Sequence, residues 1–198
     1  MKFLFDLDGT VTSEETLPLI AKHFKVEEEI LELTKQTVAG NVPFIESFIR
    51  RVNILGRLPV SQVNELLSNA SLYNDLFGFI QQHKEHCVIV TGNLSCWVEG
   101  LKQKLGVETY CSEAIVENDR VTKLLSILRK EQVVETYKAL GETVVFIGDG
   151  NNDLEAMRHA NISIATGLTH KPANSLYAIS DYIIFNEQTL CRQLNQLL

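Results

Sequence analysis

The chain begins MKFLFDLDGT (residues 1–10), and this stretch gives the first indication of both fold and chemistry. Four of its first five residues are apolar, as in a buried strand, and the run then meets Asp6 and Asp8. Two carboxylates this close repel each other, and burying them costs free energy unless a cation offsets their charge. The stretch therefore predicts a buried strand that ends at a cation-binding site.

The composition predicts a globular protein and gives no sign of a basic surface that would bind polyanions. The chain has 198 residues, of which 45% are hydrophobic, and a net charge of −7 without a basic run. Nucleic acids and anionic membranes bind clustered Lys and Arg, so we expect neither as a partner.

No apolar run reaches the roughly 18 residues needed to cross a membrane. The first apolar run breaks at Asp6, and no cleavage site follows, so it does not match a signal peptide. The four cysteines include no CxxC pair, which favours reduced thiols. We therefore expect a cytoplasmic protein, and the sequence indicates no oligomeric state.

Short apolar runs alternate with amphipathic stretches along most of the chain. The apolar runs are residues 2–5, 87–90, 143–147, 162–165 and 182–185. The amphipathic stretches are residues 75–86, 94–105, 130–140, 152–160 and 187–198. Each apolar run is continuous, as in parallel strands buried on both faces. This alternation predicts an α/β fold with a three-layer, Rossmann-like parallel sheet. Residues 109–122 are expected to form a β-hairpin that turns at Asn118 and Asp119.

The region after the first strand breaks this alternation. It contains four helix-like stretches and no strand-like run: residues 13–24, 26–40, 43–56 and 59–70. Pro43 and Pro59 lie near the starts of two of them, where proline is favoured. We therefore predict a helical cap domain at residues 13–74, inserted into a core domain of residues 1–12 and 75–198.

Polar residues follow three of the predicted strands, at the positions where an open parallel sheet binds ligands. They are Asp6, Asp8, Thr91, Gly92, Asn93, Asp149, Asn152 and Asp153. These strand ends share one edge of the sheet, so four carboxylates would face one pocket. A hard divalent cation with oxygen ligands resolves this repulsion, and Mg²⁺ suits it. The metal-site candidates are Asp6, Asp8, Asp149 and Asp153. Asp6 and Asp149 are the expected direct ligands, and Asp153 and Asn152 would support them.

Other motifs that share these residue types do not fit the chain. An EF-hand loop needs glycine at its sixth position and glutamate at its twelfth, where this chain has Val11 and Leu17. In GDGNND (residues 148–153), Asp153 replaces the third glycine of a dinucleotide fingerprint. No GxxxxGK[ST] occurs, so the chain has no P-loop.

Taken together, these motifs resemble those of the haloacid dehalogenase superfamily, specifically its phosphoserine phosphatase-like branch. FDLDGT matches the first motif, Thr91 in VTGN the second, Lys130 in LRKEQ the third and GDGNND the fourth. The helical insert resembles the cap of that branch, and the resemblance covers essentially the whole chain. It implies a Mg²⁺-dependent phosphatase that hydrolyses a small phosphorylated metabolite through an aspartyl-phosphate.

The resemblance also implies roles for single residues. Asp6 would be the nucleophile, and Asp8 would protonate the leaving oxygen and then activate water. The phosphate would be held by Thr91, Gly92 and Lys130. Lys123 and Arg129 are the alternatives to Lys130, because each lies close to it in the sequence.

The cap would recognise the substrate. Glu15 and Arg51 match the positions that hold the ammonium and the carboxylate of phosphoserine, which makes phosphoserine the first candidate. Glu15 could instead cap a helix, and Arg51 or its neighbour Arg50 could be a surface charge. Asn93 stands where the family usually has a second glycine, so it adds a side chain near the substrate.

Asn93 and Asn152 complete the candidate substrate contacts. His170 and Lys171 follow the strand at residues 162–165 and could also line the pocket, although such residues are more often exposed. Three alternative functions stay open. They are a phosphotransferase, a phosphatase for another small phosphorylated alcohol, amino alcohol or sugar, and a catalytically silent binding protein.

Overall fold

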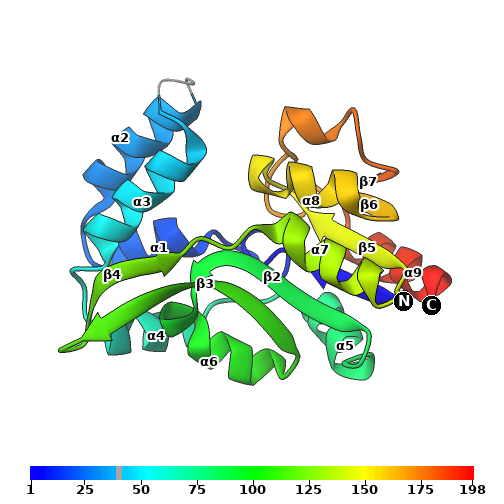
Figure 1. Ribbon diagram of the computed structural model, residues 1–198, viewed down its shortest axis with the longest axis horizontal. Helices are drawn as coiled ribbons and strands as arrows, with labels where there is room; N and C mark the ends of the chain where they lie inside the picture. The colour runs from blue at the N-terminus through cyan, green and yellow to red at the C-terminus, as the bar shows by residue number, and fades with distance from the viewer. Residues whose placement is uncertain (39–41) are drawn as a thin grey trace.

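The computed structural model describes residues 1–38 and 42–198, and its centre is one sheet (Figure 1). In the described residues the sheet has seven strands in the order β4-β3-β2-β1-β5-β6-β7. The strands are β1 (Lys2–Phe5), β2 (Cys87–Leu94), β3 (Glu108–Glu117), β4 (Arg120–Ser126), β5 (Val144–Gly148), β6 (Ile162–Thr166) and β7 (Tyr182–Ile184). All neighbours pair in parallel except β3 and β4. The predicted α/β fold with a largely parallel sheet is confirmed.

The helices cover both faces of this sheet. They are α1 (Thr16–His23), α2 (Glu27–Val38), α3 (Phe44–Leu55), α4 (Val60–Ser68), α5 (Asn74–Gln82), α6 (Ser95–Leu105), α7 (Lys130–Ala139), α8 (Leu154–His159) and α9 (Glu187–Leu197). Two short 3₁₀ helices are η1 (Asn151–Asp153) and η2 (Asn174–Leu176). Leu4 packs in one apolar cluster with α7 and α8, while Phe3 and Phe5 pack in another with α5, α6 and α9. Alternate residues of the central strand thus supply both cores.

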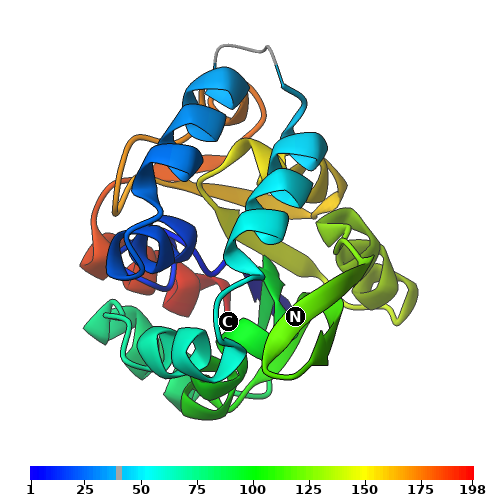
Figure 2. The ribbon, with the colours of Figure 1, turned by 90° about the vertical axis from the view of Figure 1, so that its left-hand side faces the viewer.

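The helical insert has two parts. Helices α2 and α3 pack side by side and project beyond the sheet, whereas α4 packs against α6 (Figures 1 and 2). The two ends of the insert are fastened to each other, because Ser13 N–H donates to Ser71 O (2.9 Å) and Tyr73 N–H donates to Val11 O (3.1 Å). Of the helix expected over residues 26–40, residues 39 and 40 lie outside the described residues. The domain boundaries at residues 13 and 74 stay a prediction.

The hairpin of β3 and β4 turns where the sequence predicts. Asn118 and Asp119 both have positive φ (50° and 62°), as a two-residue hairpin turn requires. The strands run further than expected, over 108–126. Asp119 Oδ1 accepts a hydrogen bond from Ser61 N–H (2.8 Å), so the hairpin tip caps the start of α4. No helix in residues 1–38 and 42–198 is long and apolar enough to cross a membrane.

Candidate active site

A buried ion cluster lies beyond the ends of β1 and β5. Lys130 is the first residue of α7, and its Nζ lies 2.5 Å from Asp6 Oδ1 and 2.6 Å from Asp153 Oδ1. Burial works to lower the pKa of Lys130, but Asp153 and Asp6 outweigh it, and the pKa is raised. The structure therefore brings Lys130 to Asp6, whereas Lys123 and Arg129 lie exposed. Because the ammonium is held by two carboxylates, it remains charged at the nucleophile predicted from the sequence.

Three carboxylates meet at this edge and could hold a metal ion. Asp6, Asp149 and Asp153 each offer an oxygen within 4.8 Å of the others. Asp153 Oδ2 accepts hydrogen bonds from the backbone N–H of Asp149 (3.1 Å) and Gly150 (3.0 Å), so Asp153 also holds its own loop. Burial raises the pKa of Asp6 and of Asp149, and the charge of Asp153 adds to both shifts.

These donors fit a hard cation. They are all oxygens. Burial raises the pKa values of Asp6 and Asp149, the charge of Asp153 adds to both shifts, and Lys130 works against them. Mg²⁺ favours this chemistry, since it binds through one or two carboxylates and keeps waters or phosphate oxygens. Asp6 and Asp149 would be its protein ligands, and Asp153 would orient the loop around them.

Asp8 is held by residues from α1 and β2. Its Oδ1 accepts hydrogen bonds from the N–H (2.9 Å) and hydroxyl of Thr16, and its Oδ2 accepts from Asn93 Nδ2 (2.6 Å) and Thr91 Oγ1 (3.4 Å). Burial is the main cause that raises the pKa of Asp8 to about 6, and the charge of Glu15 adds to it. A carboxyl group that titrates near neutrality can both donate and accept a proton. Asp8 lies outside the group of Asp6, Asp149 and Asp153, which we call the acidic trio, so its role as a metal ligand stays a prediction.

The side chain of Asn93 forms hydrogen bonds within the protein. Its Nδ2 donates to Asp8 and to Thr16 Oγ1 (2.9 Å), and its backbone N–H donates to Thr91 Oγ1 (3.1 Å). Asn93 is buried, as is Thr91, whereas Gly92 between them is partly exposed. The residue that departs from the family pattern thus holds Asp8. Sequence reasoning did not find Thr16, because threonine at a helix start is common and carries no motif.

A cavity of about 380 Å³ covers this group of residues. The sheet edge contributes Asp6, Asp8, Gly92, Asn93, Asp149, Gly150 and Asn152, and we call these residues the floor. The helical insert contributes Leu17, Pro18, Ile30, Phe48 and Arg51, which we call the helical wall. Glu15 and His170 complete the lining, while Thr91, Lys130 and Asp153 are buried behind it.

The helical wall brings Arg51, not Arg50, to the cavity. Arg50 is exposed and pairs with Glu46 (2.5 Å). Burial lowers the pKa of Arg51, and the charge of Glu15 partly reverses this shift. The two residues expected to recognise an amino acid, Glu15 and Arg51, therefore share the cavity with the acidic floor.

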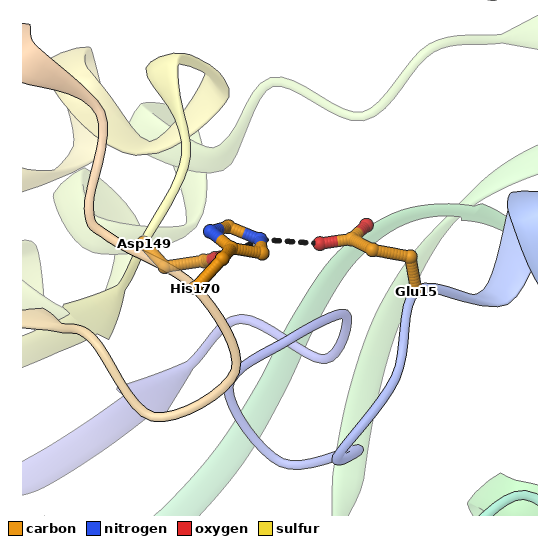
Figure 3. Close-up of side chains that lie close together, drawn as sticks. All are labelled: Glu15, Asp149 and His170. Atoms are coloured by element: carbon orange, nitrogen blue, oxygen red, sulfur yellow. Dashed lines mark hydrogen bonds and ion pairs between the residues drawn. The ribbon is translucent and has the colours of Figure 1, made fainter. Parts of the chain in front are cut away.

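His170 joins the site from the loop after β6 (Figure 3). Its Nε2 lies 2.8 Å from Glu15 Oε1 and 3.0 Å from Asp149 Oδ2. The hydrogen bond with Asp149 is the largest cause that raises the pKa of His170 to about 10, against the effect of burial. Lys171 is exposed and does not line the cavity. Only the position of His170 after a strand end pointed to it in the sequence.

Comparison with known proteins identifies the family. A model of the haloacid dehalogenase-like hydrolases matches residues 3–161. The chain is similar to a phosphoserine phosphatase of Methanocaldococcus jannaschii, with 28% identity over 175 residues that cover 82% of this chain and 83% of that protein. A phosphoserine phosphatase of Archaeoglobus fulgidus is 29% identical, and there the match covers 82% of this chain but only 51% of that relative.

Solved structures share the fold. A substrate-bound phosphoserine phosphatase superposes with a TM-score of 0.81 and 24% identity, over 100% of this chain and 99% of that chain. A phospho-aspartyl intermediate analogue of phosphoserine phosphatase gives a TM-score of 0.78 and 24% identity, over 97% of each chain. At this identity the likeness shows the fold alone, but the family model spans most of the sequence. This chain therefore belongs to the haloacid dehalogenase-like hydrolase family.

Proposed function

We propose that this hydrolase is a Mg²⁺-dependent phosphomonoester phosphatase, and that it acts on a small cytosolic metabolite through an aspartyl-phosphate on Asp6. One observation carries the proposal: the buried ammonium of Lys130 contacts Asp6 at 2.5 Å, next to an acidic trio that fits a divalent cation. A nucleophilic carboxylate must meet a phosphate dianion, and such a pair of cations offsets their repulsion.

The reaction follows from the two aspartates after β1. A carboxylate oxygen of Asp6 attacks phosphorus, and the bond from phosphorus to the ester oxygen breaks with its electron pair on that oxygen. Asp8 in its acid form donates a proton to the leaving alcohol. Asp8 then accepts a proton from water as the water attacks phosphorus, and the bond to Asp6 breaks to release inorganic phosphate.

The charges around Asp6 hold the transferring phosphoryl group. Mg²⁺ bound at Asp6 and Asp149 would supply positive charge against the phosphate oxygens. Lys130 remains charged because burial is outweighed by its two carboxylate partners. Gly92 lines the cavity, which supports it as a phosphate contact, and the buried Thr91 precedes it in β2. Asn152 lines the same floor.

Phosphoserine is the first candidate substrate. The proposal rests on Glu15 and Arg51, which line the same cavity as the floor and would hold an ammonium and a carboxylate. The relatives named phosphoserine phosphatase support the same class of substrate. We further propose that residues 13–74 act as a cap over a core of residues 1–12 and 75–198, because the insert supplies the helical wall.

A phosphate-release screen tests the function. The purified protein with Mg²⁺ should release phosphate from p-nitrophenyl phosphate and, within a broad metabolite panel, efficiently from phosphoserine. Parallel assays with added alcohol acceptors separate hydrolysis from phosphoryl transfer. Absence of phosphate release or transfer from every ester would contradict the proposal and favour a silent binding protein. Efficient release from other esters without phosphoserine would keep the phosphatase and reject the substrate.

A further inference from the structure

We propose that His170 is a specificity-determining residue: by pairing with Glu15, it lets the site accept phosphorylated hydroxy acids without an amino group as readily as phosphoserine. This inference rests on the proposed function, since it concerns which substrates reach the same floor. It predicts that the ammonium of phosphoserine adds little to binding in this protein, whereas its phosphate and carboxylate add much.

The imidazole competes for the carboxylate that would bind an ammonium. His170 Nε2 lies 2.8 Å from Glu15 Oε1, a normal hydrogen-bond distance, and the two residues are 155 positions apart in the sequence. An incoming ammonium must share this oxygen or displace the imidazole. It therefore gains only the difference between its own contact with Glu15 and the hydrogen bond that it displaces, instead of the full gain from an unpaired carboxylate.

The backbone provides room for this pairing. Gly9 has a φ of +68°, and a Cβ there would lie 2.8 Å from Asp149 Oδ2, 3.0 Å from Glu15 Oε1 and 3.4 Å from His170 Nε2. The three side chains thus lie close to the backbone of Gly9, just past β1, and Figure 3 shows the three of them together. Any larger residue at this position would push them apart.

The loop that carries the imidazole is anchored before and after it. Thr169 Oγ1 donates to Gly9 O (2.9 Å) and lies 3.0 Å from Tyr73 Oη. Further along, Ala173 N–H donates to Asp149 O (2.8 Å). These contacts hold the loop against the turn after β1, against the end of the insert and against the segment after β5. The imidazole is therefore positioned before a substrate arrives, and the competition does not require a loop rearrangement.

The helical wall of the cavity favours a substrate that carries a carboxylate. Arg51 faces the same space from the helical wall, whose other members are apolar: Leu17, Pro18, Ile30 and Phe48. A substrate carboxylate would meet the guanidinium of Arg51 there, while an ammonium would find Glu15 already paired with His170. The substrate class that fits both features is a small phosphomonoester that carries a carboxylate, with or without an α-amino group.

Calorimetry in a background that cannot turn over substrate tests this inference. Asp6→Asn protein is titrated in Mg²⁺ with O-phospho-L-serine and with its des-amino analogue, the phosphate ester of 3-hydroxypropanoate. We expect the two dissociation constants to agree within about threefold. Adding His170→Ala should shift their ratio at least about tenfold in favour of phosphoserine, because the carboxylate of Glu15 is released.

Two further variants separate pairing from loop structure. His170→Gln keeps a donor near the position of Nε2 and should retain the ratio of the parent. Lys171→Ala removes the neighbouring exposed cation, which lines no part of the cavity, and should also leave the ratio unchanged. A general loss of loop structure would weaken both ligands equally and would not move the ratio.

Several outcomes would overturn the inference. They are an unchanged ratio in His170→Ala, a parent that already prefers phosphoserine more than about tenfold, or no binding of either compound. The proposed function is judged separately, by phosphate release from the protein with Asp6 intact. A parent that releases no phosphate from any ester would overturn the function, while the dissociation constants would still decide the role of His170.

Discussion

The floor of the cavity and its helical wall differ in what they contain and in how they are held. The floor is charged: Asp6 pairs with Lys130, and Asp8 accepts hydrogen bonds from Thr16 and Asn93. The helical wall is apolar apart from Arg51 and belongs to an insert fastened at its two ends. This difference predicts that the floor carries the chemistry, while Arg51 of the helical wall helps to choose the substrate.

The physical origin of the difference lies in the elements themselves. Parallel strands bring the ends of β1 and β5 to one edge, and backbone pairing places Asp6 and Asp149 beside each other. Helices α2 and α3 pack mainly on each other, so their side chains can vary without disturbing that edge. Variants of the floor should therefore affect all substrates, and variants of the helical wall only some.

The largest effect is expected at the nucleophile. Asp6→Asn keeps the shape of the side chain, but the amide is a far poorer nucleophile, so turnover of every phosphate ester should fall at least about a thousandfold. Acid quenching during turnover of a labelled ester should trap base-labile label on the parent, and the variant should lack it. Turnover within tenfold of the parent would contradict covalent catalysis.

Removal of the metal should lower activity almost as strongly as Asp6→Asn, because the metal site lies on the floor. EDTA should abolish activity on all substrates, and Mg²⁺ should restore it, because the charge of the acidic trio is otherwise only partly offset. Ca²⁺ should restore it poorly, since its larger shell recruits extra carboxylate oxygens and would tie up Asp6. Mg²⁺ should also raise the melting temperature of the parent but not of Asp149→Asn, as thermal denaturation would measure. Full activity in chelator would mean that the floor is not a metal site.

The helical wall should show a selective effect. Arg51→Ala removes a charge-assisted contact that contributes about 2–4 kcal/mol when its partner is left desolvated. The value of kcat/KM for phosphoserine should then fall roughly 30- to 1000-fold, while p-nitrophenyl phosphate should be almost unaffected. Arg50→Ala is the matched control, because this exposed neighbour does not line the cavity. Equal losses on both substrates would instead assign Arg51 to folding or closure of the insert.

The smallest expected effect is a difference in pH dependence. Burial raises the pKa of Asp8 to about 6, so its acid form is present below that pH and is lost above it. Above pH 6, kcat/KM for phosphoserine should fall about tenfold per pH unit, because its alkoxide leaving group needs the proton. For p-nitrophenyl phosphate, whose leaving group is stable without a proton, the fall should be within about threefold.

A variant of Thr16 sharpens this test. Hydrogen bonds from Thr16 lower the pKa of Asp8, so Thr16→Val should move the fall to higher pH. The comparison of pH profiles for the two substrates measures this shift. Identical profiles for both substrates would contradict the role of Asp8 as the acid.

Much of the fold and part of the floor could be predicted because their signals are local. Continuous apolar runs marked β1, β2 and β5, and the polar residues directly after them lie at the common edge of the sheet. The turn of the hairpin was also readable, since Asn118 and Asp119 tolerate positive φ. Asp6, Asp149 and Asp153 followed from these positions alone, and Lys130 from the resemblance to a family.

Only the tertiary structure decided how these residues are partnered. The packing of α4 on α6, the use of Asn93 and Thr16 to hold Asp8, and the pairing of His170 with Glu15 all join distant segments. Such contacts leave no periodic pattern in the sequence, because each depends on the geometry of two loops that meet only after the chain has folded. The sequence by itself therefore determined the sheet and the charged residues at its edge, while folding determined what each charge touches.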